Sequence, residues 1–232
     1  MRAAVPVRLK PTAPIAPAAI LVGDPGRALL LAQELLEQPK MSNHARGLWG
    51  YGGHTADGEE LTIQATGIGG PSAALVLTDL AELGVERAVR VGTCVAFGAA
   101  ARAGELLAVE AALAVGGSAA SFGIAAGETV APDAELHGRL ASALAADARP
   151  VTVASLDTMP GREQAAAGAG AADMQSLATL ATARGLGVAA GVLLIVTETE
   201  RGESLEGERL EEIAARAGRV ALEALSNPQV EG

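Results

Sequence analysis

The feature that most restricts the fold of this chain is its alternation of short apolar runs with longer amphipathic runs. The apolar runs have the length of β-strands and lie at residues 19–22, 61–65, 87–91, 105–115, 151–155 and 188–196. The amphipathic runs have the length of helices and lie at residues 27–38, 72–83, 133–146, 173–184 and 206–225. This alternation predicts an α/β fold in which a parallel or mixed sheet is covered by helices on both faces.

Length and composition fit a single domain over residues 1–232. The 232 residues contain no repeat of fixed period and no linker, and α/β domains of this size are common. Half of the residues are hydrophobic but only 2% are aromatic. The core must therefore be built from alanine, leucine, valine and isoleucine.

The charge balance and the single cysteine narrow the possible partners. Lys and Arg total 17 against 27 Asp and Glu, a net charge of −10, which repels nucleic acids and anionic membranes. Residues 1–19 are interrupted by prolines and fit neither a signal peptide nor a membrane span. Because Cys94 is the single cysteine, an internal disulfide is excluded, and we expect a cytoplasmic protein that binds small molecules.

The turn after the first predicted strand is a candidate anion site. Gly23-Asp24-Pro25-Gly26 is followed by Arg27, and ligands of α/β sheets bind beyond the carboxyl ends of the strands. Small residues let backbone N–H groups approach an anion there, and Arg27 adds a charged fork. The alternative is an ordinary turn with an incidental charge.

Two further arginines have a place in this hypothesis. Arg90 ends the apolar run 87–91 and is followed by Gly92 and Thr93, which favours a binding site at a strand end, with a structural arginine in an ion pair as the alternative. Arg46 lies in a predicted loop, where it is either a ligand of the anion or an ordinary surface charge.

The glycine-rich loop 66–72 does not fit a dinucleotide-binding site. Its Gly67-Ile68-Gly69-Gly70 core is interrupted by Pro71 and Ser72, and Arg90 stands where the carboxylate for the ribose would lie. The loop therefore argues against a nicotinamide-dependent oxidoreductase. The three histidines are too scattered in the sequence to form a metal site, and we expect no metal.

Together these turns resemble the nucleoside phosphorylase family, which includes uridine phosphorylase and the hexameric bacterial purine nucleoside phosphorylases. The resemblance covers about residues 5–226 and implies a single domain with a mixed, partly barrel-like sheet flanked by helices. It rests on the order and spacing of the motifs GDPGR at 23–27, TGIGGPS at 66–72, RVGTC at 90–94, SLDT at 155–158 and DMQS at 173–176.

The resemblance assigns roles to the residues of these motifs. It implies inorganic phosphate as co-substrate, no cofactor, and a homo-oligomer built as a dimer or a trimer of dimers, in which Arg46 reaches the site of a neighbouring subunit. Arginines and backbone amides suit phosphorolysis, because they hold the phosphate without supplying a competing nucleophile. The implied phosphate ligands are Gly23, Arg27, Arg46, Arg90 and Thr93, with Arg90 also catalytic.

The predicted nucleoside contacts favour uridine. Arg162 and Gln164 resemble, in reversed order, the pair with which uridine phosphorylases hold the pyrimidine, and Met159 occupies the position of the usual phenylalanine. An amide and a guanidinium match the oxygens and N3 of uracil. The alternative is a polar loop with incidental charges.

Three positions depart from the family pattern. Met174 is expected beneath the ribose, but Gln175 replaces the glutamate that holds the ribose hydroxyls, and Arg8 stands nearest to the place of the missing N-terminal histidine. Glu198 follows the last strand, where purine enzymes carry an acid that protonates the base. It is either that general acid or an exposed carboxylate at a strand end.

These observations predict phosphorolysis of a nucleoside to free base and ribose 1-phosphate, with uridine as the preferred substrate. The arginines Arg27, Arg46 and Arg90 favour phosphorolysis over hydrolysis. The alternatives are a purine nucleoside phosphorylase, or a family member that binds phosphate or a phosphorylated metabolite without turnover.

Overall fold

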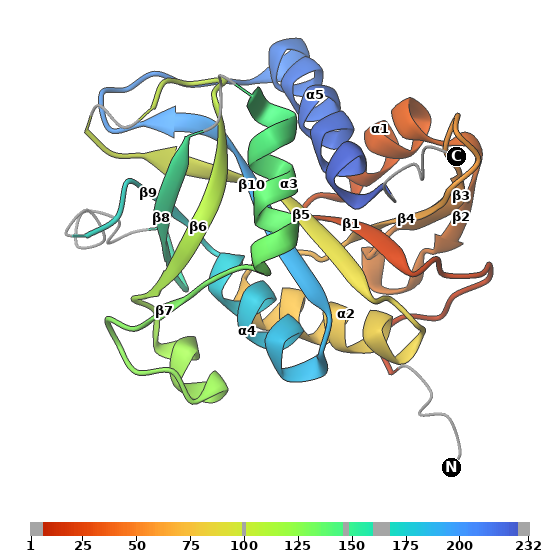
Figure 1. Ribbon diagram of the computed structural model, residues 1–232, viewed down its shortest axis with the longest axis horizontal. Helices are drawn as coiled ribbons and strands as arrows, with labels where there is room; N and C mark the ends of the chain where they lie inside the picture. Colours follow the sequence, from red (N-terminus) through yellow and green to blue (C-terminus); the bar gives the residue numbers. More distant parts are fainter. Residues whose placement is uncertain (1–6, 99–100, 146–148, 160–167, 227–232) are drawn as a thin grey trace.

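The strands of this chain pair into one mixed sheet. The computed structural model describes residues 7–98, 101–145, 149–159 and 168–226. Along the sheet the strand order is β10-β6-β8-β9-β5-β1-β4-β3-β2, with β7 paired to β6 (Figure 1). The strands are β1 Ala18–Val22, β2 Glu37–Asn43, β3 Gly50–His54, β4 Glu60–Ala65, β5 Arg87–Ala96, β6 Leu106–Ala114, β7 Thr129–Val130, β8 Pro150–Ser155, β9 Ala171–Asp173 and β10 Ala189–Thr199.

Five of these strands close into a barrel. β10 pairs with β6, β6 with β8, β8 with β9, β9 with β5, and β5 returns to β10. The β10–β6 and β9–β5 pairs are antiparallel and the others are parallel. The predicted mixed, partly barrel-like α/β fold is confirmed.

An open extension continues from the barrel through β5. β1 lies between β5 and β4 and is parallel to both, which places the carboxyl ends of these strands at one edge. β3 and then β2 extend the sheet beyond β4 as antiparallel strands. The sequence analysis missed these two strands, because β3 is rich in glycine and β2 is largely polar, and neither composition is typical of a strand.

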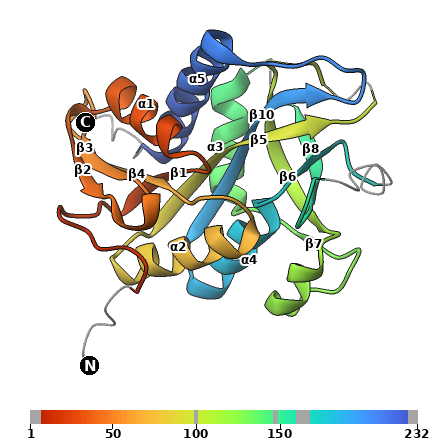
Figure 2. The ribbon, with the colours of Figure 1, turned by 180° about the vertical axis from the view of Figure 1, so that it is seen from behind.

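The helices form a layer on each face of the sheet, as the alternation predicts. α1, α3 and α5 cover one face, and α2 and α4 lie together on the other (Figures 1 and 2). Gly218 allows α5 to approach α1 closely, because a Cβ there would lie 2.6 Å from Leu31. The helices are α1 Pro25–Leu35, α2 Gly70–Glu82, α3 Ala134–Leu144, α4 Ser176–Leu186 and α5 Gly207–Leu225. No helix in the described ranges is both long and apolar enough to span a bilayer.

Three predicted boundaries were wrong. The helix expected at 27–38 ends at Leu35 and β2 begins at Glu37, because Pro39 disfavours helical backbone at the residue before it. The helix expected from Asp173 begins at Ser176, because Asp173 belongs to β9. β5 continues to Ala96, so Arg90 lies inside the strand and not at its end.

Candidate functional site

The largest described cavity, about 650 Å³, opens beyond the carboxyl ends of the parallel strands. β1 and β4 end just before it, while β5, β9 and β10 contribute side chains to its wall. It brings together eight residues that the sequence analysis assigned to the site. These are Gly23, Arg27, Arg90, Thr93, Met159, Met174, Gln175 and Glu198.

Three helices begin at residues that line this cavity. Asp24 caps α1, accepting a hydrogen bond from the Arg27 N–H at 2.8 Å, and Pro25 fits the first turn. α2 is capped by Gly69, whose φ of 82° favours glycine, and α4 is capped by Gln175.

The N-terminus of a helix carries partial positive charge and N–H groups without partners inside the helix. In α4 these groups are bound within the chain, since the Ser176 N–H donates to Asp173 and the Leu177 N–H donates to the Ser155 hydroxyl. The N-termini of α1 and α2 therefore attract an anion more than that of α4 does.

Arg90 lies at the base of the cavity and is held by an ion pair. Its Nη2 is 2.9 Å from Oδ2 of Asp173 and its Nη1 is 2.6 Å from Oε1 of Gln175. The side chain of Asp173 is fully buried and also accepts hydrogen bonds from the N–H and hydroxyl of Ser176. Arg90 is therefore both the paired structural arginine and a cavity residue, and the two interpretations of the sequence are compatible.

The room for this arginine comes from Gly92, two residues along the same face of β5. A Cβ at Gly92 would lie 2.6 Å from Cζ of Arg90 and 2.8 Å from Cδ2 of Leu194. The guanidinium therefore lies directly over the glycine backbone. In the motif RVG, the glycine is required because Arg90 folds back along the strand.

Arg27 brings a second guanidinium to the same cavity. Burial lowers the pKa of Arg27, the Asp24 carboxylate opposes this shift, and the positive charge of Arg90 lowers the pKa further. The two guanidinium groups thus lie close enough to repel each other. An anion bound between them would relieve this repulsion.

Gln175 uses its amide to join three parts of the site. Its Nε2 donates to the carbonyl oxygens of Gly67 at 2.7 Å and Gly69 at 3.2 Å. Its Oε1 accepts hydrogen bonds from Arg90 and from the Thr66 hydroxyl at 3.2 Å. The side chain is 3% exposed, so it belongs to the base of the cavity.

Other lining residues of the cavity come from strand ends and a loop. Met159 and Met174 are half-buried there, and Glu198 is exposed at a bulge of β10. Glu198 thus matches the predicted exposed carboxylate at a strand end, although it also lines the cavity.

Four predicted site residues are not placed in this cavity. Arg8 forms an ion pair with Asp79 of α2, with Nη1 and Oδ1 2.9 Å apart, and Arg46 is exposed in a short 3₁₀ turn with φ of 61°. Neither lines the cavity of its own chain, and contacts across subunits stay a prediction. Arg162 and Gln164 lie outside the described residues.

Sequence reasoning missed Asp173 as the partner of Arg90 and Thr197 as a lining residue. The signal for Asp173 was its position as an acidic residue directly after the apolar residues 171–172 and before Ser176 and a predicted helix. Pairing with Arg90 could not be read from the sequence, because the two residues are 83 positions apart.

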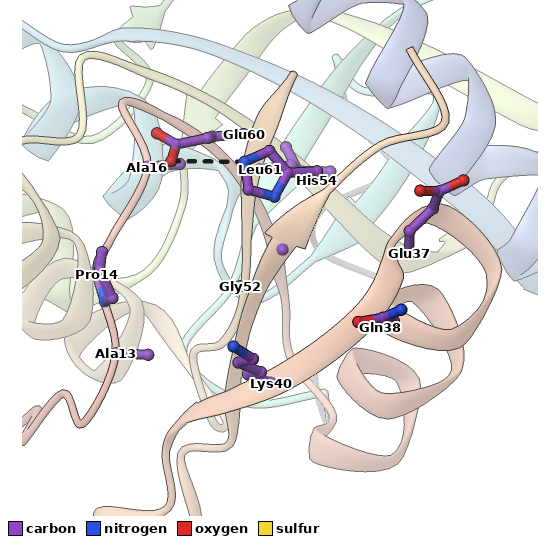
Figure 3. Close-up of a pocket in the computed structure, with 11 residues that line it drawn as sticks. Ala13, Pro14, Ala16, Glu37, Gln38, Lys40, Gly52, His54, Glu60 and Leu61 are labelled. Carbon is purple, nitrogen blue, oxygen red and sulfur yellow. Dashed lines mark ion pairs between the residues drawn. The ribbon is translucent and has the colours of Figure 1, made fainter. Parts of the chain in front are cut away.

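A second cavity, of about 300 Å³, lies at the far edge of the sheet between β2, β3 and the segment around Pro14 (Figure 3). His54 of β3 and Glu60 of β4 are cross-strand neighbours in its lining, with Nε2 and Oε1 3.8 Å apart. Both side chains are more than 60% exposed, and no helix begins at its lining residues. This second cavity is therefore a weaker candidate for an anion site than the first.

Comparisons with known proteins agree on one family. A family model described as the phosphorylase superfamily matches residues 17–226. A DeoD-type purine nucleoside phosphorylase of Oceanobacillus iheyensis is 43% identical over 81 residues, and one of Clostridium novyi is 42% identical over 81 residues. Each of these alignments spans only 34% of this chain and 34% of the relative.

A solved structure agrees with this assignment at the level of the fold. It is the crystal structure of purine nucleoside phosphorylase from Toxoplasma gondii in complex with immucillin-H. The match has a TM-score of 0.82 at 20% identity and covers 92% of this chain and 91% of that one.

Proposed function

Because the chain belongs to the phosphorylase superfamily, we propose that it cleaves a nucleoside with inorganic phosphate to give the free base and ribose 1-phosphate. The observation that carries this proposal is the pair of arginines, Arg27 and Arg90, in a cavity where three helices begin. Hydrolysis needs water at the sugar carbon and has no use for this anion site. Phosphate as the attacking group needs it directly.

The nucleoside we propose is a purine, the alternative that the sequence analysis gave after uridine. The similar relatives of Oceanobacillus iheyensis and Clostridium novyi are purine nucleoside phosphorylases. The residues that favoured uridine, Arg162 and Gln164, lie outside the described residues. Similarity therefore supports the purine alternative better.

A purine substrate gives Glu198 a role. The departing purine carries negative charge that a proton at the base would neutralise, and Glu198 is a carboxylate that lines the cavity. We propose it as the general acid, with Met174 beneath the sugar and Met159 beside the base. Thr93 and Gly23 would complete the phosphate contacts.

The charges of the cavity support an oligomer. Asp24, Asp173 and Glu198 outnumber Arg27 and Arg90 among the lining residues, so a phosphate dianion would meet a site with no excess positive charge. A further cation would correct this balance. We propose that Arg46 of a second copy supplies it, since Arg46 is exposed on its own chain. The co-substrate is phosphate and no cofactor is proposed.

The test is a panel of inosine, adenosine, guanosine and uridine, each incubated with and without phosphate. We expect ribose 1-phosphate from at least one purine nucleoside and no turnover without phosphate. Base release that is independent of phosphate would indicate a hydrolase. Thermal stabilisation by phosphate with no turnover of any nucleoside would indicate the binding-protein alternative.

A further inference from the structure

The side chain of Gln175 is a candidate for a role other than sugar binding, because all of its hydrogen-bonding groups are used within the chain. A primary amide has two N–H donors and room for two hydrogen bonds at its oxygen. In Gln175 both donors reach the carbonyls of Gly67 and Gly69, and the oxygen accepts from Arg90. The Thr66 hydroxyl lies 3.2 Å from the same oxygen and shares its single proton with the Val22 carbonyl. A ribose hydroxyl would have to break one of the first three bonds or displace Thr66.

The partners also fix which way the amide points. The two carbonyl oxygens need donors and the guanidinium of Arg90 needs an acceptor, so the flipped amide would put like groups against each other at these three contacts. The Thr66 hydroxyl can donate or accept and suits either orientation. The glycine loop is shaped to this arrangement. Gly67 and Gly69 have φ of 74° and 82°, a backbone conformation that glycine adopts readily and that directs both carbonyls toward Gln175.

A glutamate would not fit this arrangement. Both of its oxygens are acceptors, so the carbonyls of Gly67 and Gly69 would face a carboxylate with no donor between them. A second carboxylate beside Arg90, in addition to Asp173, would also neutralise charge that an anion in the cavity needs. The neutral amide of Gln175 avoids both effects.

We propose that Gln175 is a positioning residue for the anion site: it fixes the guanidinium of Arg90 and the loop 67–69 relative to each other, and it does not hold the sugar hydroxyls. The buried Nε of Arg90 has no hydrogen-bond partner among the described residues, so Gln175 and Asp173 provide the restraints on this guanidinium. This proposal rests on the proposed function for the identity of the anion as phosphate. Its measurable consequence is that substitutions at Gln175 weaken the binding of phosphate more than the binding of the nucleoside.

The experiment compares the wild type with Gln175→Glu and Gln175→Met, which keep the length of the side chain. For both variants we expect phosphate to stabilise the protein against heat much less, and KM for phosphate to rise about tenfold, the effect of one lost hydrogen bond to a charged group. KM for the nucleoside and the ratio of activity on a ribonucleoside to that on its 2′-deoxy analogue should stay within twofold, roughly the scatter of such contacts.

The matched control is Thr179→Val on the same helix. Thr179 is buried and its hydroxyl has no hydrogen-bond partner among the described residues, so this variant should keep the wild-type response to phosphate. Thermal unfolding without phosphate shows which variants fold. If one of the two Gln175 variants fails to fold, the other one tests the inference.

Two outcomes would overturn the inference. One is an unchanged phosphate response in both folded variants. The other is a higher KM for the ribonucleoside, with lost discrimination against the 2′-deoxy analogue, at constant KM for phosphate, which would make Gln175 a sugar ligand. Phosphate binding by the wild type without turnover contradicts the proposed function alone, because the thermal measurement needs no turnover.

Discussion

The two sides of the cavity differ in how the chain holds them. On the anion side, Arg90, Asp173 and Gln175 are each at most 5% exposed and are joined by direct hydrogen bonds. On the nucleoside side, Glu198 is exposed and Met159 is half-buried at the end of a loop. The anion side is thus held by buried hydrogen bonds of the chain itself, whereas the nucleoside side is formed by a loop and strand ends.

The largest effect is expected from Arg90→Ala. This change removes a cavity guanidinium and leaves the buried carboxylate of Asp173 without its ion-pair partner. We expect a loss of about 3–5 kcal/mol in the free energy of unfolding and no thermal stabilisation by phosphate. Melting curves with and without phosphate measure both effects. The control is Arg219→Ala, whose ion pair with Glu34 is exposed. A preserved phosphate response in Arg90→Ala would place the anion site elsewhere.

Glu198→Gln tests the nucleoside side. If this carboxyl protonates the base, kcat on a purine nucleoside should fall about 100-fold, the usual size of a general-acid contribution. The phosphate-induced thermal shift should not become smaller, because the change removes the charge of one of the three carboxylates that line the cavity. The neighbouring Glu200→Gln, which is not among the lining residues, serves as the control. Equal activity of the two variants would make Glu198 a carboxylate without a catalytic role.

Gly92→Ala tests whether the anion side depends on the position of Arg90 and not only on its presence. The added methyl group would displace the guanidinium, since a Cβ would lie 2.6 Å from Cζ of Arg90. We expect phosphate affinity to fall about tenfold through loss of one charge-assisted hydrogen bond. Gly138→Ala, with nothing within 4 Å of the added Cβ, should leave affinity unchanged and stabilise α3 slightly. Identical phosphate titrations of the two variants would contradict the prediction.

The smallest effect is expected from Asp157→Asn, beside Met159. The Ser118 hydroxyl lowers the pKa of Asp157, burial opposes this, and the N–H groups of Ser118 and Gly117 lower the pKa further. Because the pKa of Asp157 is lower in the folded state than in the unfolded state, where it is about 3.9, the ionised carboxylate stabilises the folded protein above that pH. This stabilisation is lost as the pH falls through the pKa of the folded state. Since the side chain is exposed, the loss at neutral pH should be below about 1 kcal/mol.

Unfolding by denaturant at several pH values measures this effect. The difference between the wild type and Asp157→Asn should shrink as the solution becomes acidic. A difference that grows on acidification would show that the carboxylate does not stabilise the loop.

Strands were predicted correctly from the sequence where the local pattern of residues was clear. The strands β1, β4, β6, β8 and β10 were placed to within a few residues, because each is a continuous apolar run. The strands β2 and β3 were missed, because their residues are polar or glycine and only pairing with β4 makes them strands.

For the site, the sequence selected Gly23, Arg27, Arg90 and Thr93 from turns and strand ends, and the fold brings them into one cavity. The hydrogen bonds of Arg90 with Asp173 and Gln175 could not be predicted, because they join residues more than 80 positions apart.

The α/β class, the turns that line the cavity and the resemblance to one family can be read from the sequence, since hydrophobic periodicity, glycine turns and motif spacing are local properties of the chain. Folding alone makes Arg90 both an ion-paired residue and a lining residue of the cavity, and binds the amide of Gln175 within its own chain. These outcomes depend on the closure of the barrel, which brings β9 beside β5. Hydrogen-bonding capacity is decided by the neighbours that folding supplies and not by the residue type alone.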